Sequence, residues 1–202
     1  MSAYVHVCSP DLPPIHMREV LRYMGARETT EEVSALIMEC IEELGETLTC
    51  RVCWREINVR IDGKGLDLGF VKTESRALAT NFKGCDRAIL FAATTGLGID
   101  RLITRYTHIS PARALCFDAI GAERIEALCD AFCERMKEEY QKSGFGLRPR
   151  FSPGYGDLPL SLQRDIFNAL DCPKRIGLSL NESLIMSPTK SVTAFVGVSR
   201  QD

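Results

Sequence analysis

Residues 150–159 hold the residue types best suited to binding a small polar ligand. The guanidinium of Arg150 can grip a carboxylate or phosphate with two parallel hydrogen bonds. Pro153 restricts the backbone, whereas Gly154 permits a positive φ or a close approach of the main chain to a ligand. With Tyr155 at its centre, such a segment can hold a small zwitterion or a nucleotide. The alternative is a surface loop whose glycines and prolines serve only to make turns.

A carboxylate precedes this loop on a long predicted helix. The pattern predicts a helix over residues 111–142, with Gly121 as a candidate break. Apolar residues recur at helical spacing through its second half, and Glu126 stands at the border of that stripe. A border carboxylate can face a cleft, or it can be one more solvated residue on the flank of a helix.

A glycine-containing turn offers a weaker indication of ligand binding. The apolar strand predicted at residues 88–93 runs into a turn with Gly96 and Gly98, and a helix is expected at 99–106. The N-terminus of a helix can bind an anion. The third glycine of the dinucleotide fingerprint is missing, and no acidic residue about 20 positions further on closes a β-α-β unit. This favours a simple connection between strand and helix.

The nine cysteines suggest reduced thiols, because their number is odd and the sequence opens without a signal peptide pattern. Cys50 and Cys53 form a C-x-x-C pair, which is half of a zinc site at best. Alternation with Val52 and Trp54 favours a strand in which both cysteines are small apolar residues. A redox or metal role is the alternative.

Composition indicates one domain spanning residues 1–202, since a chain of 202 residues that is 45% hydrophobic can bury one sizeable core. The 25 basic and 27 acidic side chains nearly balance, which argues against binding to nucleic acid or to an anionic membrane. The longest apolar run, residues 88–93, is too short to span a bilayer. We therefore expect a cytoplasmic protein.

Helical and strand patterns mix along the chain without regular β-α alternation. A capping box formed by Thr29 and Glu32 is predicted to begin the second helix, and a β-hairpin turn is expected at residues 62–65. The fold class is therefore α+β, with a central antiparallel or mixed twisted sheet packed with several helices and an N-terminal helical subregion at residues 15–47. The expected helices are 17–25, 29–44, 75–82, 99–106, 111–142 and 160–170, and the expected strands are 49–60, 66–70, 88–93, 176–180, 184–186 and 191–198.

The C-terminal quarter carries an ordered set of positions. These are Arg150-x-x-Pro153-Gly154-Tyr155, a helix, and then Gly177-x-x-Leu180-x-Glu182-Ser183-x-x-Met186-x-Pro188-x-x-Ser191-Val192. Their order and spacing resemble the activation, or reactivation, domain of cobalamin-dependent methionine synthase. The helix around Glu126 is similar to the long helix that precedes the loop in that family. The resemblance is clearest over residues 110–198, and the overall arrangement looks like the stand-alone relatives of the domain.

This resemblance implies a protein that binds S-adenosylmethionine so that inactive cob(II)alamin, after a one-electron reduction, is trapped by methylation. None of the three histidines sits in the Asp-x-His-x-x-Gly pattern that supplies the lower ligand of cobalamin. The implied partner is therefore the cobalamin-binding module of a separate methionine synthase, and a flavodoxin-like protein is the candidate reductant. No general base is required, so catalysis would consist mainly of positioning.

The residues that the resemblance assigns to the S-adenosylmethionine site are Glu126, Arg150, Pro153, Gly154 and Tyr155. S-adenosylmethionine carries a carboxylate, an ammonium and a sulfonium. Arg150 can bind the carboxylate, and Glu126 can offset the positive charge. Gly154 would let the backbone approach the nucleoside, while Tyr155 could stack on it.

The sequence also departs from the family, and these departures leave other functions open. The tyrosine-bearing stretch that follows the last strand in the family has no counterpart before Asp202, so one side of the methyl-donor pocket is expected to be incomplete. The favoured function is a reactivation subunit. The alternative is a non-catalytic binding or assembly module for another corrinoid or methyltransferase protein, and a more distant one is a thiol redox protein built on Cys50 and Cys53.

Overall fold

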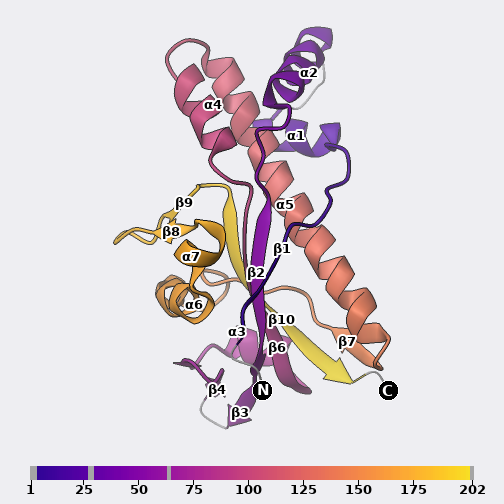
Figure 1. The fold of residues 1–202 in the computed structure, drawn as a ribbon, viewed down its shortest axis with the longest axis vertical. Coiled ribbons are helices and arrows are strands. Elements are labelled where there is room, and N and C mark those ends of the chain that lie inside the picture. Colours follow the sequence, from indigo (N-terminus) through magenta and orange to yellow (C-terminus); the bar gives the residue numbers. More distant parts are fainter. Residues whose placement is uncertain (1–3, 27–29, 63–64, 201–202) are drawn as a thin grey trace.

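The computed structural model describes residues 4–26, 30–62 and 65–200. A long helix, α5 (Pro111–Gln141), runs beside a five-stranded sheet along most of the long axis of the molecule (Figure 1). The other described helices are α1 (Met17–Met24), α2 (Glu31–Leu44), α3 (Arg76–Asn81), α4 (Gly98–Tyr106), α6 (Gln163–Leu170) and α7 (Cys172–Ile176). The described strands are β1 (His6–Cys8), β2 (Arg51–Asn58), β3 (Arg60–Asp62), β4 (Gly65–Asp67), β5 (Lys72–Thr73), β6 (Cys85–Thr94), β7 (Phe145–Leu147), β8 (Ser179–Leu180), β9 (Met186–Ser187) and β10 (Ser191–Arg200).

The main sheet has the strand order β1-β2-β6-β10-β7, and all of its neighbouring strands are antiparallel. β6 lies at its centre and is nearly continuous in buried residues, as expected for a strand that is covered on both faces. The N-terminal and C-terminal parts of the chain both contribute to this sheet, through β1 and β10. The predicted α+β class with a central antiparallel sheet is confirmed.

Successive residues of a strand point to opposite faces, so the sheet divides the core into two clusters. On one face, Val52, Phe91 and Val196 pack against the second half of α5. On the other face, Leu90 and Phe195 pack against α3, α6 and α7. A third cluster joins α1, α2, α4 and the first half of α5 beyond the end of the sheet. The N-terminal helical subregion therefore extends the molecule rather than covering the sheet (Figure 1).

Glycine packing explains one wrong local prediction and the shape of one predicted turn. α5 passes through Gly121 without a break, and a Cβ there would lie 2.9 Å from Ile99 Cγ2, so this glycine permits close packing rather than ending the helix. In the turn after β6, Gly96 has φ of 83°, and a Cβ on Gly98 would overlap the Thr47 carbonyl. Backbone and side-chain atoms of Thr47 and Thr49 pack closely against this turn, which joins β6 to α4.

Several predicted boundaries also shift. The segment from Cys172 does not merely end a helix, because α7 begins there with a proline in its first turn and extends to Ile176. The strand predicted at 176–180 is therefore reduced to β8, and the strand predicted at 66–70 is reduced to β4. Thr30 is the N-cap of α2, with its Oγ1 accepting from Val33 N at 3.2 Å, whereas the predicted cap Thr29 lies outside the described residues. Gly63 and Lys64 of the predicted hairpin turn also lie outside them.

Cys50 and Cys53 pack on opposite faces of the sheet. Cys50 belongs to the cluster beneath α5, and the fully buried Cys53 belongs to the cluster beneath α6 and α7. Burial raises the pKa of the Cys50 thiol above its ordinary value, which lowers its reactivity at neutral pH. The structure therefore does not bring this pair together as one redox or metal site.

In the part of the chain that the structure describes, no helix is both long and apolar enough to cross a membrane.

Candidate functional site

The sheet itself positions Arg150. After β7, Arg148 N donates to Gly197 O at 2.8 Å, which prolongs the pairing with β10 by one residue. Phe151 and Phe195 then exchange two backbone hydrogen bonds, each of 2.8 Å. Arg150 thus lies between two attachment points on β10, and the backbone that carries it is fixed before any ligand arrives.

Arg150 and Glu126 meet as an ion pair between Nη2 and Oε2. Asp130 lies one helical turn beyond Glu126 on α5, and its Oδ1 is 3.5 Å from Arg150 Nη2. Two carboxylates therefore face one guanidinium, which leaves a negative balance available to a cationic ligand. The second terminal nitrogen of the guanidinium, Nη1, is buried and has no hydrogen-bond partner among the described residues.

The loop that follows is a compact turn. Gly154 N donates to Leu158 O at 2.9 Å and Leu158 N to Tyr155 O at 3.0 Å, so the chain closes on itself. Gly154 has φ of 93°, a conformation that favours glycine and gives this position a role in the turn. Tyr155 is 70% exposed and projects away from the core, where it can still meet a ligand or a partner.

Asp157 is a residue whose role the sequence analysis missed. Its carboxylate accepts hydrogen bonds from Ser75 Oγ at 2.5 Å, Arg76 N at 2.8 Å and Ala77 N at 3.1 Å. It therefore binds the N-terminus of α3 and ties the loop to a helix about 80 residues earlier in the chain. The Ser75 hydroxyl and the two backbone N–H groups hold the pKa of Asp157 below its ordinary value.

This contact predicts an acid-side loss of stability. Because the folded pKa of Asp157 is lowered, its contribution is complete above the unfolded value of about 3.9 and is lost as the pH falls through the folded pKa. We expect Asp157→Asn to unfold at a lower temperature than wild type at neutral pH, with the difference shrinking as the pH is lowered below about 4. Thermal melts across this range measure it. Asp11→Asn, which removes an exposed carboxylate outside these contacts, should show no such convergence.

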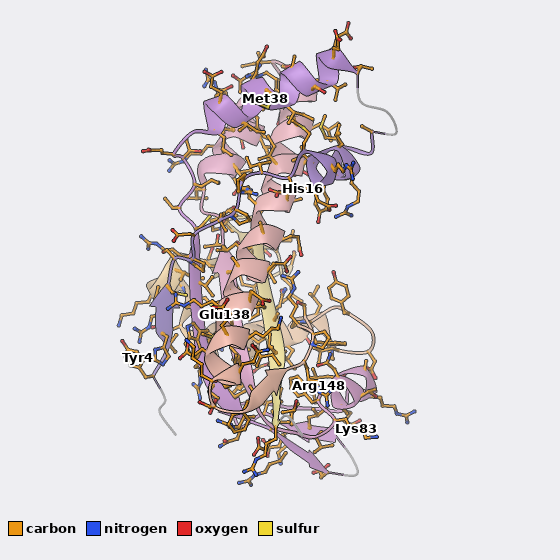
Figure 2. All side chains as sticks on the ribbon, turned by 90° about the vertical axis from the view of Figure 1, so that its right-hand side faces the viewer. Tyr4, His16, Met38, Lys83, Glu138 and Arg148 are labelled. Carbon is orange, nitrogen blue, oxygen red and sulfur yellow. The ribbon has the colours of Figure 1, made fainter. Side chains whose placement is uncertain are left out.

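Two cavities meet at the Glu126–Arg150 pair. The larger, of about 1010 Å³, lies between α1, the second half of α5 and residues 147–150. Figure 2 shows two residues of its lining, His16 and Arg148, at different heights along α5. The smaller, of about 420 Å³, lies between the loop, α6 and the start of β10. Both volumes are of the size usual for small-molecule sites.

The structure brings together most of the residues assigned from the sequence. Glu126 and Arg150 line both cavities, and Pro153 and Tyr155 line the smaller one. Gly154, between Pro153 and Tyr155, shapes the turn but lines neither cavity. Cys133 also lines the larger cavity, where burial raises the pKa of its thiol to about 11 and keeps it protonated at neutral pH.

A buried ion pair fixes the wall of the larger cavity opposite the loop. Glu123 and Arg124 of α5 have side chains only 6% and 4% exposed, with Arg124 Nη2 2.6 Å from Glu123 Oε1. Arg124 Nη1 also donates to Pro13 O at 2.7 Å, and His16 N donates to Glu123 Oε1 at 3.0 Å. The pair thus holds the segment that leads into α1 against α5. Neighbouring charged residues on a helix gave no sequence signal for this role.

Comparison with solved structures identifies the fold. A crystal structure described as the MetH reactivation domain bound to AdoHcy matches with a TM-score of 0.68 and 17% sequence identity, covering 98% of this chain and 79% of that chain. Comparison with curated proteins gave no significant match. The fold is thus that of a methionine synthase reactivation domain.

A family model places the chain more specifically. The model for the activation domain of vitamin B12-dependent methionine synthase matches residues 77–201, which is more than half of the sequence. The chain belongs to this family, and the resemblance seen in the sequence is confirmed.

Proposed function

We propose that this protein binds S-adenosylmethionine at the Glu126–Arg150 pair and presents its methyl group to the cobalamin of a separate methionine synthase. The observation that carries the proposal is the meeting of these two residues between two cavities. They are 24 positions apart in the sequence, and the family resemblance assigned both to one site. The AdoHcy bound by the structural neighbour is a ligand of the same chemical class.

The side chains fit the charges of S-adenosylmethionine. The unpaired Nη1 of Arg150 is a donor suited to the ligand carboxylate, and Arg150 would keep or exchange its bond to Glu126. Glu126 and Asp130 supply negative charge for the ammonium and sulfonium groups. Pro153 and Tyr155 would bound the nucleoside side of the site, and Gly154 would set the turn that places them.

The chain contributes positioning rather than acid–base chemistry. Bound to the partner, cobalamin supplies the reduced cobalt nucleophile, and the sulfonium already activates the methyl group. The fixed backbone of Arg150 and the tethered loop hold the ligand in one orientation. The cobalamin-binding module would approach the open side of the site, where Tyr155 is exposed, and a flavodoxin-like protein is the proposed electron donor.

Isothermal titration calorimetry of the full chain with S-adenosylmethionine tests the binding step. We expect saturable heat with one ligand per chain, and tighter binding than for S-adenosylhomocysteine, which lacks the sulfonium charge. Glu126→Gln should reduce the difference in affinity between the two ligands, because it removes the negative charge that favours the sulfonium cation. The absence of heat at high ligand concentration would overturn the proposal.

The methyl transfer step needs a second assay. The chain, S-adenosylmethionine and reduced flavodoxin are added to a purified cobalamin-binding module, and methylation of cobalt is followed by its absorption spectrum. Methylation that depends on this chain supports the reactivation function. Ligand binding together with a lack of methylation would favour the non-catalytic binding module instead.

A further inference from the structure

Two cysteines meet between α2 and α5, away from the Glu126–Arg150 pair. Cys40 on α2 and Cys116 on α5 are both fully buried in the cluster that joins the helices beyond the end of the sheet. Their thiols are hydrogen-bonded to each other across the interface between the two helices. A thiol pair in hydrogen-bond contact needs only a short approach to form a disulfide bond.

Ion pairs between the same two helices fix the register of the cysteines. Arg113 lies one helical turn before Cys116 on α5. Its Nη1 donates to Glu39 Oε2 at 2.8 Å, and its Nη2 donates to Glu43 Oε2 at 2.7 Å. Glu39 and Glu43 flank Cys40 on α2, so these contacts hold the facing sides of α2 and α5 together around the two thiols.

The surroundings give the two thiols unequal acidity. The hydrogen bond from Cys116 and the positive charge of Arg113 hold the pKa of the Cys40 thiol below its ordinary value. Burial and the neighbouring carboxylates act against this shift but do not cancel it. The hydrogen bond to Cys40 and burial raise the pKa of Cys116, which stays protonated. Arg113 Nε is buried without a hydrogen-bond partner among the described residues, which leaves a donor available to a thiolate.

We propose that Cys40 and Cys116 form a reversible disulfide that locks α2 onto α5 when a peroxide oxidises the protein. The Cys40 thiolate attacks one oxygen of hydrogen peroxide, the O–O bond breaks, and the released hydroxide takes up the proton lost by Cys40, which gives a sulfenic acid and water. The sulfur of Cys116 then attacks the sulfenic sulfur, so that the S–S bond forms, the S–O bond breaks and the proton of Cys116 leaves with the second water. Two thiols are oxidised and one peroxide is reduced, and a dithiol reverses the reaction by disulfide exchange.

The position of α2 explains how the oxidant reaches the pair and what the bond changes. α2 lies at the end of the molecule beyond the sheet (Figure 1), and a peripheral helix opens locally more easily than the central strands. Hydrogen peroxide is close to water in size, so a brief opening admits it. Val20 of α1 is buried in the same cluster as the two cysteines, and α1 forms one wall of the larger cavity. The disulfide therefore fixes the helices behind that wall under oxidising conditions.

Peptide mapping of the full chain by mass spectrometry tests the proposal. Reduced protein is treated with a small excess of hydrogen peroxide, the remaining thiols are alkylated in denaturant, and the non-reduced peptides are mapped. We expect a peptide that joins Cys40 to Cys116 and its complete loss after treatment with dithiothreitol. Because the bond closes a long loop, the melting temperature of the oxidised protein should be higher by roughly 10 °C.

Three variants sharpen the test. Cys116→Ala should abolish both the linked peptide and the rise in melting temperature. Cys8→Ala is the matched control, because Cys8 is only partly buried and lies on the edge strand β1, and it should leave both results unchanged. Arg113→Gln should slow formation of the disulfide by about threefold or more, since it removes the charge that favours the Cys40 thiolate.

Two results would overturn the proposal. The first is oxidation that begins at Cys8, or that joins Cys53 to Cys172, a second hydrogen-bonded thiol pair, while Cys40 stays reduced. The second is a bond between Cys40 and Cys116 that leaves the melting temperature unchanged, because such a bond would fix nothing. The peptide map of wild type decides the first point even if Cys116→Ala is unstable. S-adenosylmethionine takes no part in these measurements, so their failure would leave the proposed function intact.

Discussion

Arg150→Ala should weaken S-adenosylmethionine binding by about 100-fold or more, because it removes the cation proposed to receive the ligand carboxylate and leaves Glu126 without its partner. Calorimetry on the full chain measures the change. Arg150→Lys should recover only part of the affinity, since an ammonium keeps the charge and loses the two-pronged geometry. An affinity that falls from wild type to Arg150→Lys and again to Arg150→Ala is expected when an arginine binds a carboxylate through two hydrogen bonds.

A matched control distinguishes the loss of a ligand contact from the general effect of removing a positive charge. Arg101→Ala removes an exposed arginine from α4, away from both cavities that meet at Arg150. Its affinity should equal that of wild type. If Arg150→Ala bound S-adenosylmethionine as tightly as the control, the Glu126–Arg150 pair would be a purely structural contact and the assignment of the site would be wrong.

Glu123→Ala should have the largest effect on stability. It leaves Arg124 charged and buried without its carboxylate and also removes the acceptor for His16 N. Loss of one partner of a buried ion pair costs about 3–5 kcal/mol. For a chain of this size the melting temperature should fall by roughly 10 °C. Thermal unfolding followed by circular dichroism measures the change.

The comparison for this variant lies on the same helix. Glu134 and Lys137 form an exposed ion pair at 3.0 Å, and Glu134→Ala should lower the free energy of unfolding by less than about 1 kcal/mol. Equal losses of stability in Glu123→Ala and Glu134→Ala would show that the buried ion pair stabilises the fold no more than the exposed one. A loss confined to Glu123→Ala would also predict weaker ligand binding, because the segment from Pro13 to His16 forms one wall of the larger cavity.

The sequence predicted those parts of the candidate site that depend on the residue types of one loop and on their order. Arg150, Pro153 and Tyr155 were recognisable because a loop must use particular residues to turn and to grip an anion. The place of Glu126 at the edge of an apolar stripe left its role open, and the family resemblance assigned it to the site. The same reasoning identified β6 and β10 and the caps at Gly25 and Gly45, since each depends on residues close in the chain.

Features that depend on distant contacts could not be predicted in this way. Gly121 suggested a break, but tertiary packing against Ile99 maintains the helix through it. The role of Asp157 was missed, because its partners on α3 are about 80 positions away in the sequence. Gln163 and Thr193 have ordinary surroundings in the sequence, and only the folded chain shows that both are buried beside one cavity.

The two attachments of the loop bear on the thermodynamics of ligand binding. Phe151 joins the loop to β10, and Asp157 joins it to α3, so both ends are fixed in the ligand-free protein. A ligand that meets an ordered loop loses little binding free energy to the conformational entropy of the chain. We therefore expect the affinity of the proposed site to depend mainly on desolvation and charge, because the loop is already ordered when the protein folds.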